Sequence, residues 1–465
     1  MVVAGVQEKI GDKQHEDIID RRQAIFRAVE LAETDDIVVI AVQRCIMASF
    51  TLEEIIKATG GKVLEQVKAE FTDVVTDTRK LAEGVLFVAL KGERFNGEVF
   101  AGEALRRAAS DTQTAYQQIA AFHRKRFDIP VITITGSNGK TTTKDLTASV
   151  LGAKMKVLKT QANFNNEIGL PLTLLQLDEQ HEAAVVEVGM RGLGQIAALA
   201  PVAAPNIGIV TNVGETHMEL LGSMENIAKA KAELVEVIPS GGVVILNADN
   251  PYTAAMDAKC QPDVKVVTFG IEQAADIKAS DIESLGKETK FKCALEKNGE
   301  AHEFVLPMAG RHNVYNALAA IAAGVVMGLN AEEIQTGLSQ LEMSKMRFEY
   351  KQIGKYAVIN DAYNASPMSM KAALDTISEV AKGRSVAVLG DMLELGDNEA
   401  ELHRQVGRLV PESGVAVLIA YGKLGEEIAA GAKEKGMTEV YNAHSHEEAA
   451  ELLHKLLHDG DTIFT

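Results

Sequence analysis

One short turn constrains the fold of this chain more than any other feature of its sequence. Five strand-forming residues, 131–135, lead into a glycine- and threonine-rich turn with one lysine: Gly136, Ser137, Asn138, Gly139, Lys140, Thr141 and Thr142. Glycines let the backbone approach an anion closely, and the amides at the start of the next helix supply positive partial charge. A strand, turn and helix in this order predict a phosphate-binding loop within an α/β domain.

Two side chains of this loop have distinct predicted roles. The Lys140 ammonium would reach the β- and γ-phosphates of a nucleoside triphosphate, and the Thr141 hydroxyl would bind Mg²⁺. The motif is the short G-x-x-G-K-T form, because Ile134 stands where the longer form has its first glycine. The helical spacing of Leu146 and Val150 supports a helix directly after the loop.

Length and composition favour a soluble protein of several domains. With 465 residues, 46% of them hydrophobic and 24% charged, the chain can form about three domains that each bury a core. No apolar run is long enough to span a bilayer, and the N-terminus lacks a signal-peptide pattern, so we expect a cytoplasmic protein without membrane insertion. The net charge of -18 argues against nucleic-acid binding. Cys45, Cys260 and Cys293 are widely spaced and are expected to be free thiols.

Alternating strand and helix patterns divide the chain into four segments. These are an isolated helix and strand in 1–46, a small α/β domain in 47–128, a central domain in 129–341 and a second nucleotide-fold-like domain in 342–465. The central segment predicts a mostly parallel, doubly wound sheet, with strands near 131–135, 183–188, 207–211, 243–247 and 264–269. The last segment has predicted strands near 356–360, 385–389, 415–420, 437–441 and 461–464.

Polar residues at the carboxyl ends of such strands are candidate ligand contacts. Glu187 ends a predicted strand and is placed to hold Mg²⁺ near the phosphate loop, although a strand can also end in a surface glutamate. His217 follows the next strand, and on its own it could equally be a packed histidine. Lys229 and Lys231 lie on one predicted helix and point in different directions, and nothing local distinguishes either from a solvated lysine.

Several motifs of this chain resemble those of the Mur ligases of bacterial cell-wall synthesis. Three stretches carry the family likeness: TGSNGKTTTK at 135–144, NFNNEIGLP at 163–171 and GRHNVYNA at 310–317. Two more are similar to the MurF type of the family: DAYNASP at 361–367 and LGDMLELG at 389–396. The resemblance runs from about Phe50 almost to the end of the chain, and the motifs occur in the family's order.

The resemblance implies a fold and a metal site. The fold is α/β in three domains: a small UDP-sugar-binding domain, a central P-loop ATPase domain with a mostly parallel sheet, and a Rossmann-like C-terminal domain. ATP and Mg²⁺ are the implied cofactors, with four residues around the metal: Thr141, Glu187, His217 and Lys231. In the family a lysine two residues before a glutamate is carbamylated, and Lys231 before Glu233 matches this spacing while Lys229 does not.

The same resemblance assigns further contacts. It places Asn313 near the adenine, Arg347 near the γ-phosphate and Asp361 near the ribose. The implied UDP contacts are Thr76, Asp77, Thr78 and Arg79, although this run taken alone also fits a solvated turn. The residues expected to position the peptides are Asn163, Asn166, Tyr363 and Asn364.

The implied reaction joins D-alanyl-D-alanine to UDP-N-acetylmuramoyl-tripeptide through an acyl phosphate, in a monomer. The expected catalytic residues are Lys140, Glu187, His217, Lys231 and Arg347. Two alternatives stay open at this point. One is another amide ligase of the superfamily, such as the tripeptide ligase or a folylpolyglutamate synthase, and the other is a nucleotide-binding protein without catalysis.

Four features depart from the family pattern. Glu98 stands where relatives have a histidine, and the first domain is expected to be shortened near 107–111. The chain ends at Thr465, before a basic stretch that relatives carry, which implies a truncated last domain. Residues 1–46 resemble the C-terminal tail of the preceding, MurE-type tripeptide ligase, and we expect them to be an added segment.

Overall fold

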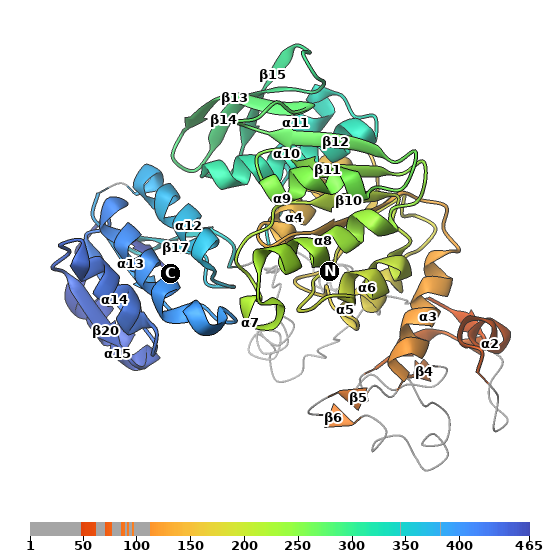
Figure 1. The fold of residues 1–465 in the computed structure, drawn as a ribbon, viewed down its shortest axis with the longest axis horizontal. Coiled ribbons are helices and arrows are strands. Elements are labelled where there is room, and N and C mark those ends of the chain that lie inside the picture. Colours follow the sequence, from red (N-terminus) through yellow and green to blue (C-terminus); the bar gives the residue numbers. More distant parts are fainter. Residues whose placement is uncertain are drawn as a thin grey trace, which may run out of the picture.

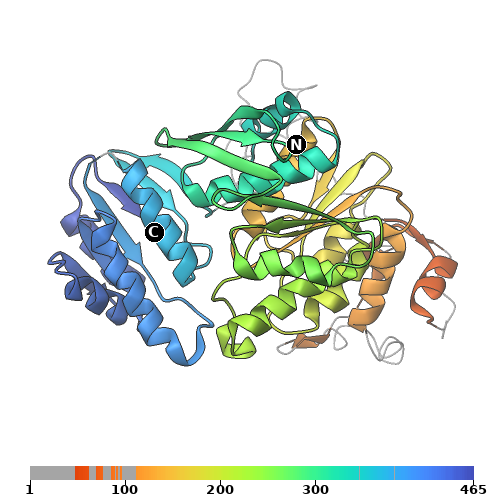
Figure 2. The same cartoon turned by 45° about the horizontal axis from the view of Figure 1, so that its top comes forward.

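The computed structural model describes most of the chain after its first 47 residues. The described residues are 48–61, 70–76, 85–88, 91–92, 95–96, 112–344, 346–381 and 383–465. In Figures 1 and 2 the C-terminal domain lies on one side of the central domain, and the N-terminal elements lie on the opposite side. The predictions for residues 1–46, Asp77, Thr78, Arg79, Glu98 and 107–111 lie outside the described residues.

The central domain is built on a sheet of nine strands, in the order β15-β14-β13-β12-β11-β10-β7-β9-β8. Six neighbouring strands and β13 run parallel: β8 (Val157–Lys159), β9 (Ala183–Glu187), β7 (Val131–Thr135), β10 (Ile207–Val210), β11 (Val243–Asn247), β12 (Lys265–Gly270) and β13 (Ile277–Ser284). The expected mostly parallel sheet is therefore confirmed. The sheet continues into two antiparallel strands that the sequence patterns did not predict, β14 (Thr289–Ala294) and β15 (Ala301–Leu306).

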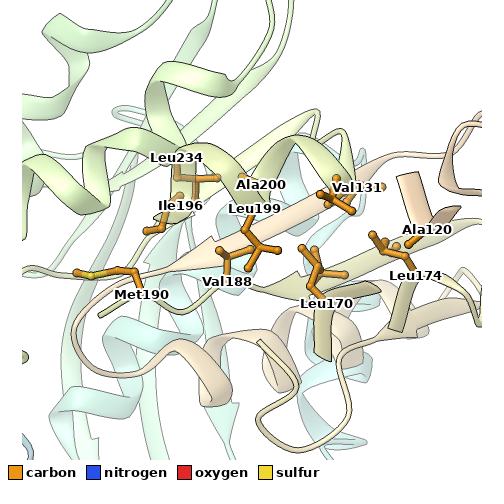
Figure 3. Packing of buried hydrophobic residues seen from close by; sticks show 14 of the residues in the cluster. Ala120, Val131, Leu170, Leu174, Val188, Met190, Ile196, Leu199, Ala200 and Leu234 are labelled. Atoms are coloured by element: carbon orange, nitrogen blue, oxygen red, sulfur yellow. The ribbon is translucent and has the colours of Figure 1, made fainter. Parts of the chain in front are cut away.

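Helices cover both faces of this sheet, and all five residues of β7 are buried. Ile132 and Ile134 pack in one buried cluster with α4 (Lys140–Gly152) and α10 (Arg311–Val326), and α11 (Ala331–Ser339) also contributes to it. Val131 belongs to the other cluster, with α5 (Gly169–Leu174), α6 (Gln195–Ala203) and α8 (Met224–Val237). Figure 3 shows the apolar side chains of this second cluster. The phosphate-binding loop thus leaves a strand that is fixed from two sides.

The N-terminal elements are short and share the core of the central domain. They comprise β1 (Phe50–Thr51), α2 (Leu52–Thr59), β2 (Glu70–Phe71), β3 (Asp73–Val75), β4 (Val85–Phe87), β5 (Lys91–Gly92) and β6 (Phe95–Asn96). Helix α3 (Thr112–Arg124) packs against α2 on one side and against α5 and α6 on the other. Its Ala120, shown in Figure 3, lies in the same buried cluster as Leu170 and Leu174 of α5.

The C-terminal domain has a six-stranded sheet in the order β16-β17-β21-β18-β19-β20. Its strands are β16 (Glu349–Ile353), β17 (Tyr356–Asn360), β18 (Ser385–Leu389), β19 (Val417–Tyr421), β20 (Val440–Ala443) and β21 (Thr462–Phe464). Its helices are α12 (Pro367–Val380), α13 (Glu399–Glu412), α14 (Gly425–Glu434) and α15 (His446–Leu456). The last strand of the chain is central, because Ile463 pairs with Val358 of β17 and with Val386 of β18. The five strands predicted for this segment are confirmed, and only β16 was missed.

Short helices complete the structure: α7 (Met218–Leu221), α9 (Pro251–Ala254), and the 3₁₀ turns η4 (Ala255–Lys259) and η5 (Gly396–Asn398). Within the described part of the chain, no helix has the length and apolar character needed to cross a membrane.

Candidate active site

The phosphate-binding loop joins β7 to α4, as predicted. Gly139 has φ of +78° and is the residue before α4, and its carbonyl accepts the Thr143 amide at 2.8 Å. A Cβ atom on Gly139 would lie 2.3 Å from Asn316 Oδ1 on α10, and one on Gly136 would lie 1.9 Å from Thr211 Oγ1. Both glycines are therefore required by close packing of the loop against neighbouring elements.

Residues that follow β10 hold the loop in shape. The Asn138 amide donates to Asn212 Oδ1 at 2.9 Å, and Thr211 Oγ1 donates to the Asn138 carbonyl at 2.6 Å. Ser137 Oγ donates to the Gly214 carbonyl at 2.9 Å. Asn212 was not among the predicted residues, because a contact between residues this far apart depends on two adjacent parallel strands and leaves no local pattern.

Lys140 lies over the loop with its ammonium close to the backbone. Its Nζ donates to the carbonyls of Gly136 at 2.9 Å and Ser137 at 3.1 Å. Burial lowers the pKa of Lys140, Glu187 opposes this effect, and Arg347 of the C-terminal domain adds to it. Three charged groups therefore lie close enough to influence one another: the loop lysine, the carboxylate of β9 and an arginine of the C-terminal domain.

Glu187 is a buried carboxylate beside the loop. It is not a surface glutamate at a strand end, which was the other interpretation of the sequence. Its side chain is 2% exposed. Glu187 Oε2 accepts the Thr141 hydroxyl at 2.9 Å, and Oε1 accepts Asn165 Nδ2 at 2.7 Å. The motif at 163–171 contains Asn165, but its contact with Glu187 could not be predicted from the sequence, because it depends on how separate elements pack. Hard oxygen donors from Thr141 and Glu187 at one point suit Mg²⁺.

The structure distinguishes the two lysines of α8. Lys231 is 2% exposed, whereas Lys229 is exposed to solvent. Burial lowers the pKa of Lys231 well below its ordinary value, and the positive charge of Lys140 lowers it further. Glu233 binds the start of α6, because its carboxylate accepts the amides of Gly194 at 2.6 Å and Ala197 at 3.0 Å. The unusual lysine is therefore the one that the family spacing selects.

His217 lies directly before α7 and contacts the C-terminal domain. Its backbone has φ of +57°, and its Nδ1 is hydrogen-bonded to Oε2 of Glu394. Burial lowers the pKa of His217, although Glu394 acts in the opposite direction. The motif at 389–396 includes Glu394, yet the sequence alone gave no reason to pair it with His217.

The C-terminal domain contributes the remaining charged residues. The Arg347 guanidinium lies over the Tyr363 ring, 4.0 Å from its centroid. Asp361 accepts the Phe348 amide at 3.0 Å, and burial raises its pKa to about 6. Ser366 caps α12, and its Oγ also donates to Asn138 Oδ1 of the phosphate-binding loop at 3.1 Å. This last contact joins the two domains at the loop itself.

Other predicted residues have structural partners or face solvent. Asn313 is buried; its Nδ2 donates to the Ala309 carbonyl at 2.7 Å, and its Oδ1 accepts Asn316 Nδ2 at 3.1 Å. Asn166 Oδ1 accepts the Gly169 amide at 2.8 Å at the start of α5. Asn163 and Asn364 are exposed, whereas Thr76 and Thr142 are half-buried.

Only two of the four predicted metal ligands, Glu187 and His217, are of the carboxylate, histidine and cysteine types that make up most metal sites. Across the described ranges, no group of three or more His, Cys, Asp and Glu side chains is arranged to hold a metal ion. This suits Mg²⁺, which is usually bound by one or two carboxylates together with water and phosphate oxygens. The oxygens of Thr141 and Glu187 meet that requirement, and His217 and Lys231 remain the other predicted ligands.

Comparisons with known proteins match nearly the whole described chain. The Mur ligase middle domain matches residues 134–324, and the Mur ligase glutamate ligase domain matches residues 346–465. The UDP-N-acetylmuramoyl-tripeptide--D-alanyl-D-alanine ligase of Bacillus subtilis is 40% identical over 81% of this chain and 88% of the relative. The ligase of the same name from Escherichia coli is 34% identical over 82% of this chain and 88% of the relative.

A solved structure agrees with these matches. The crystal structure of MurF from Acinetobacter baumannii superposes with a TM-score of 0.82 at 29% sequence identity, over 90% of this chain and 95% of that structure.

Proposed function

The chain belongs to the Mur ligase family, and from this premise we propose that it joins D-alanyl-D-alanine to UDP-N-acetylmuramoyl-tripeptide at the expense of ATP. The relatives that carry this activity in their names are 40% and 34% identical over most of their length. The observation that carries the proposal is the hydrogen bond between Thr141 and buried Glu187, beside Lys140 and Lys231. It places a phosphate-binding loop and a carboxylate together, as an ATP-driven ligase requires.

We propose that the phosphates of ATP lie along Gly136–Thr141. The backbone amides at the start of α4 and the Lys140 ammonium would bind the phosphate oxygens. Mg²⁺ bound by Thr141 and Glu187 would neutralise negative charge on the phosphates. Asn313, Arg347 and Asp361 are the proposed contacts to adenine, γ-phosphate and ribose.

Lys231 is proposed to act as a carbamate. Burial lowers the pKa of Lys231 well below its ordinary value, which favours the neutral amine. The nitrogen lone pair of that amine can attack CO₂, forming a C–N bond and releasing one proton to solvent. The product carries a carboxylate-like anion in place of a cation. This change would make Lys231 an oxygen ligand and remove its repulsion from Lys140 and the metal.

The chemistry follows from the charges that converge on the γ-phosphate. The terminal carboxylate of the tripeptide attacks the γ-phosphorus, and the bond to ADP breaks, while Lys140 and Arg347 stabilise the negative charge. The amine of D-alanyl-D-alanine then attacks the acyl carbon. The new amide forms as phosphate leaves with the bridging oxygen, and the amine proton goes to solvent.

The substrate contacts outside the phosphate site are also proposals. Four N-terminal residues, Thr76, Asp77, Thr78 and Arg79, are proposed to bind the UDP group. Four residues near the loop and α12, Asn163, Asn166, Tyr363 and Asn364, are proposed to position the peptides. We assign UDP binding to 47–128, ATP binding to 129–341 and completion of the site to 342–465. We also propose that the enzyme is a cytoplasmic monomer.

Amine specificity tests the proposal. The purified protein should release ADP when ATP, Mg²⁺, UDP-N-acetylmuramoyl-tripeptide and D-alanyl-D-alanine are all present, and mass spectrometry should find the pentapeptide product. Glutamate or diaminopimelate in place of the dipeptide should give no product. ADP release that depends on one of these amino acids would instead show a different ligase of the same superfamily, and binding of ATP with no product in any mixture would show a protein without catalysis.

A further inference from the structure

We propose that Glu394 of the C-terminal domain is a positioning residue for His217 of the central domain. The inference rests on the proposed function, because it concerns how His217 is presented to the metal of that reaction. The hydrogen bond between His217 Nδ1 and Glu394 Oε2 carries it. This contact crosses the domain boundary, so each of the two domains supplies one of its partners.

Both partners are held in uncommon backbone conformations. His217 has φ of +57° and Glu394 has φ of +63°, and neither is a glycine. Non-glycine residues with positive φ cost free energy and persist where surrounding contacts hold them. The His217 carbonyl accepts the amides of Leu220 at 3.2 Å and Leu221 at 3.0 Å, which ties its position to α7. The two loops are therefore shaped locally so that the side chains can meet.

A second contact fixes the same junction through the backbone. The Glu219 amide of α7 donates to the Glu394 carbonyl at 3.3 Å. A Cβ atom on Gly396 would lie 3.2 Å from Glu219 Cα, so the loop at 394–396 is packed closely against the start of α7. The side-chain contact is thus one part of a specific junction between the domains.

The charge of Glu394 alone would contribute little here. The His217 and Glu394 side chains are 25% and 35% exposed, and ion pairs that solvent can reach contribute little to stability. Arg191 is another possible partner, but its Nε lies 3.7 Å from Glu394 Oε1 and its side chain is 74% exposed. The directional hydrogen bond to the imidazole is the interaction with a chemical consequence.

That consequence is control of the imidazole tautomer. A carboxylate accepts a hydrogen bond from Nδ1–H, and keeping the hydrogen on Nδ1 places the lone pair of neutral His217 on Nε2, the nitrogen then available to a metal. Metal-binding histidines commonly donate a hydrogen bond from their other ring nitrogen to such a carboxylate. Here that carboxylate belongs to a different domain. Metal affinity at His217 and docking of the C-terminal domain are therefore reciprocally coupled.

The test uses the full chain with Mn²⁺ and ADP as probes. Mn²⁺ binding in the presence of ADP is titrated by electron paramagnetic resonance for wild type, Glu394→Ala and Glu394→Gln. The alanine variant should bind Mn²⁺ about 10- to 100-fold more weakly. The glutamine variant should recover most of the affinity, because its side-chain oxygen still accepts from Nδ1–H. Glu219→Ala is the matched control, since it removes an acidic side chain from the same junction and should leave the affinity unchanged.

A second measurement reads the tautomer directly and needs no catalysis. In ¹⁵N spectra of histidine-labelled protein, with the His217 signals assigned from a His217→Ala variant, wild type should show protonated Nδ1. Glu394→Ala should show a mixture of tautomers. Unchanged Mn²⁺ affinity and an unchanged tautomer in Glu394→Ala would overturn the inference. Ligase activity of the same wild-type preparation is assayed in parallel, and its absence would contradict the proposed function while the tautomer comparison still decided the role of Glu394.

Discussion

The two halves of the candidate site are built in different ways. The central half is buried and internally bonded: Glu187 and Lys231 are each 2% exposed, and Thr141 binds Glu187 directly. The C-terminal half lies on loops beside its sheet. Arg347 packs on Tyr363. Ser366 and Glu394 each contact the central domain through a side-chain hydrogen bond, and the Glu394 carbonyl also accepts the Glu219 amide.

This difference indicates that the two halves contribute to different steps, nucleotide binding and turnover. A buried half whose groups are largely held by neighbouring elements can bind nucleotide and metal in a fixed geometry, because those groups need little reorganisation. The half on the second domain adds the charge of Arg347, which we propose acts on the transferring γ-phosphate. The central half should therefore govern nucleotide affinity, and the C-terminal half should govern turnover.

The largest effect is expected in the central half. Lys140→Ala removes the ammonium from the phosphate loop and should lower ligase turnover by about 10³-fold, or about 4 kcal/mol, and should also weaken ADP binding. Turnover is measured as ADP release and affinity by calorimetry. Lys154→Ala is the control, because Lys154 follows the same helix and its side chain is 53% exposed. A Lys140→Ala enzyme with wild-type activity would contradict the proposed role of the central half.

Arg347→Ala tests the C-terminal half, and it should lower turnover with little effect on nucleotide affinity. Loss of the guanidinium should reduce kcat by about 10²-fold, because we propose that it stabilises charge on the transferring phosphoryl group. The affinity for ADP should change by less than about 3-fold, since ADP lacks that group. A large loss of ADP affinity with little change in kcat would reverse the proposed division.

Two aspartates should change stability with pH in opposite directions. Burial raises the pKa of Asp361 from 3.8 to about 6, so its ionisation costs stability as pH rises from about 4 to 6. Asp361→Asn should therefore be more stable than wild type at pH 8 by about 1 to 2 kcal/mol, with the difference vanishing below about pH 4.

Asp249 of the central domain provides the opposite case. Burial would raise its pKa, but hydrogen bonds from the amides of Glu272, Gln273 and Ile271 and from Tyr315 lower it overall. Asp249→Asn should be less stable than wild type at pH 8, and the loss should shrink as pH falls below the ordinary aspartate pKa. Urea unfolding from about pH 2 to pH 8 measures both variants. The same sign for both at pH 8 would refute this contrast between the domains.

The smallest effect is expected at the contact between Ser366 and the loop. Ser366→Ala removes the cap of α12 and the hydrogen bond to Asn138, and should cost about 1 kcal/mol of stability. Ser378→Ala is a suitable control, because Ser378 is an exposed serine near the other end of the same helix. Thermal melts should show a lower melting temperature only for Ser366→Ala. Equal melting temperatures would mean that this contact contributes nothing to stability.

The sequence predicted the local features of the fold well. The phosphate-binding loop, the parallel strands and the five C-terminal strands all follow from short-range patterns of apolar residues and glycine. The antiparallel strands β14 and β15 were missed. In β14 buried Phe291 and Cys293 do alternate with Lys292, but β15 begins with three exposed residues, so the pair has no clear hairpin pattern. The central position of β21 was also not predictable, since strand order depends on contacts between distant residues.

For the candidate site too, local motifs were predictable and contacts between distant residues were not. The burial of Lys231 and the exposure of Lys229 agree with the spacing that singled out Lys231. Asn165, Asn212 and Glu394 were missed because each meets its partner only after separate elements have packed. Asn166 belongs to a recognised motif, but its Oδ1 accepts backbone amides at the start of α5. Its proposed role in binding peptide therefore stays a prediction.

Oxygen transfer tests most directly the central claim that the site activates a carboxylate with the γ-phosphate of ATP. UDP-N-acetylmuramoyl-tripeptide with ¹⁸O in its terminal carboxylate is incubated with the protein, ATP, Mg²⁺ and D-alanyl-D-alanine, and the released phosphate is analysed by mass spectrometry. One ¹⁸O atom should appear in each phosphate, because the bridging oxygen of an acyl phosphate leaves with phosphorus. Released phosphate that contains no ¹⁸O would contradict the account.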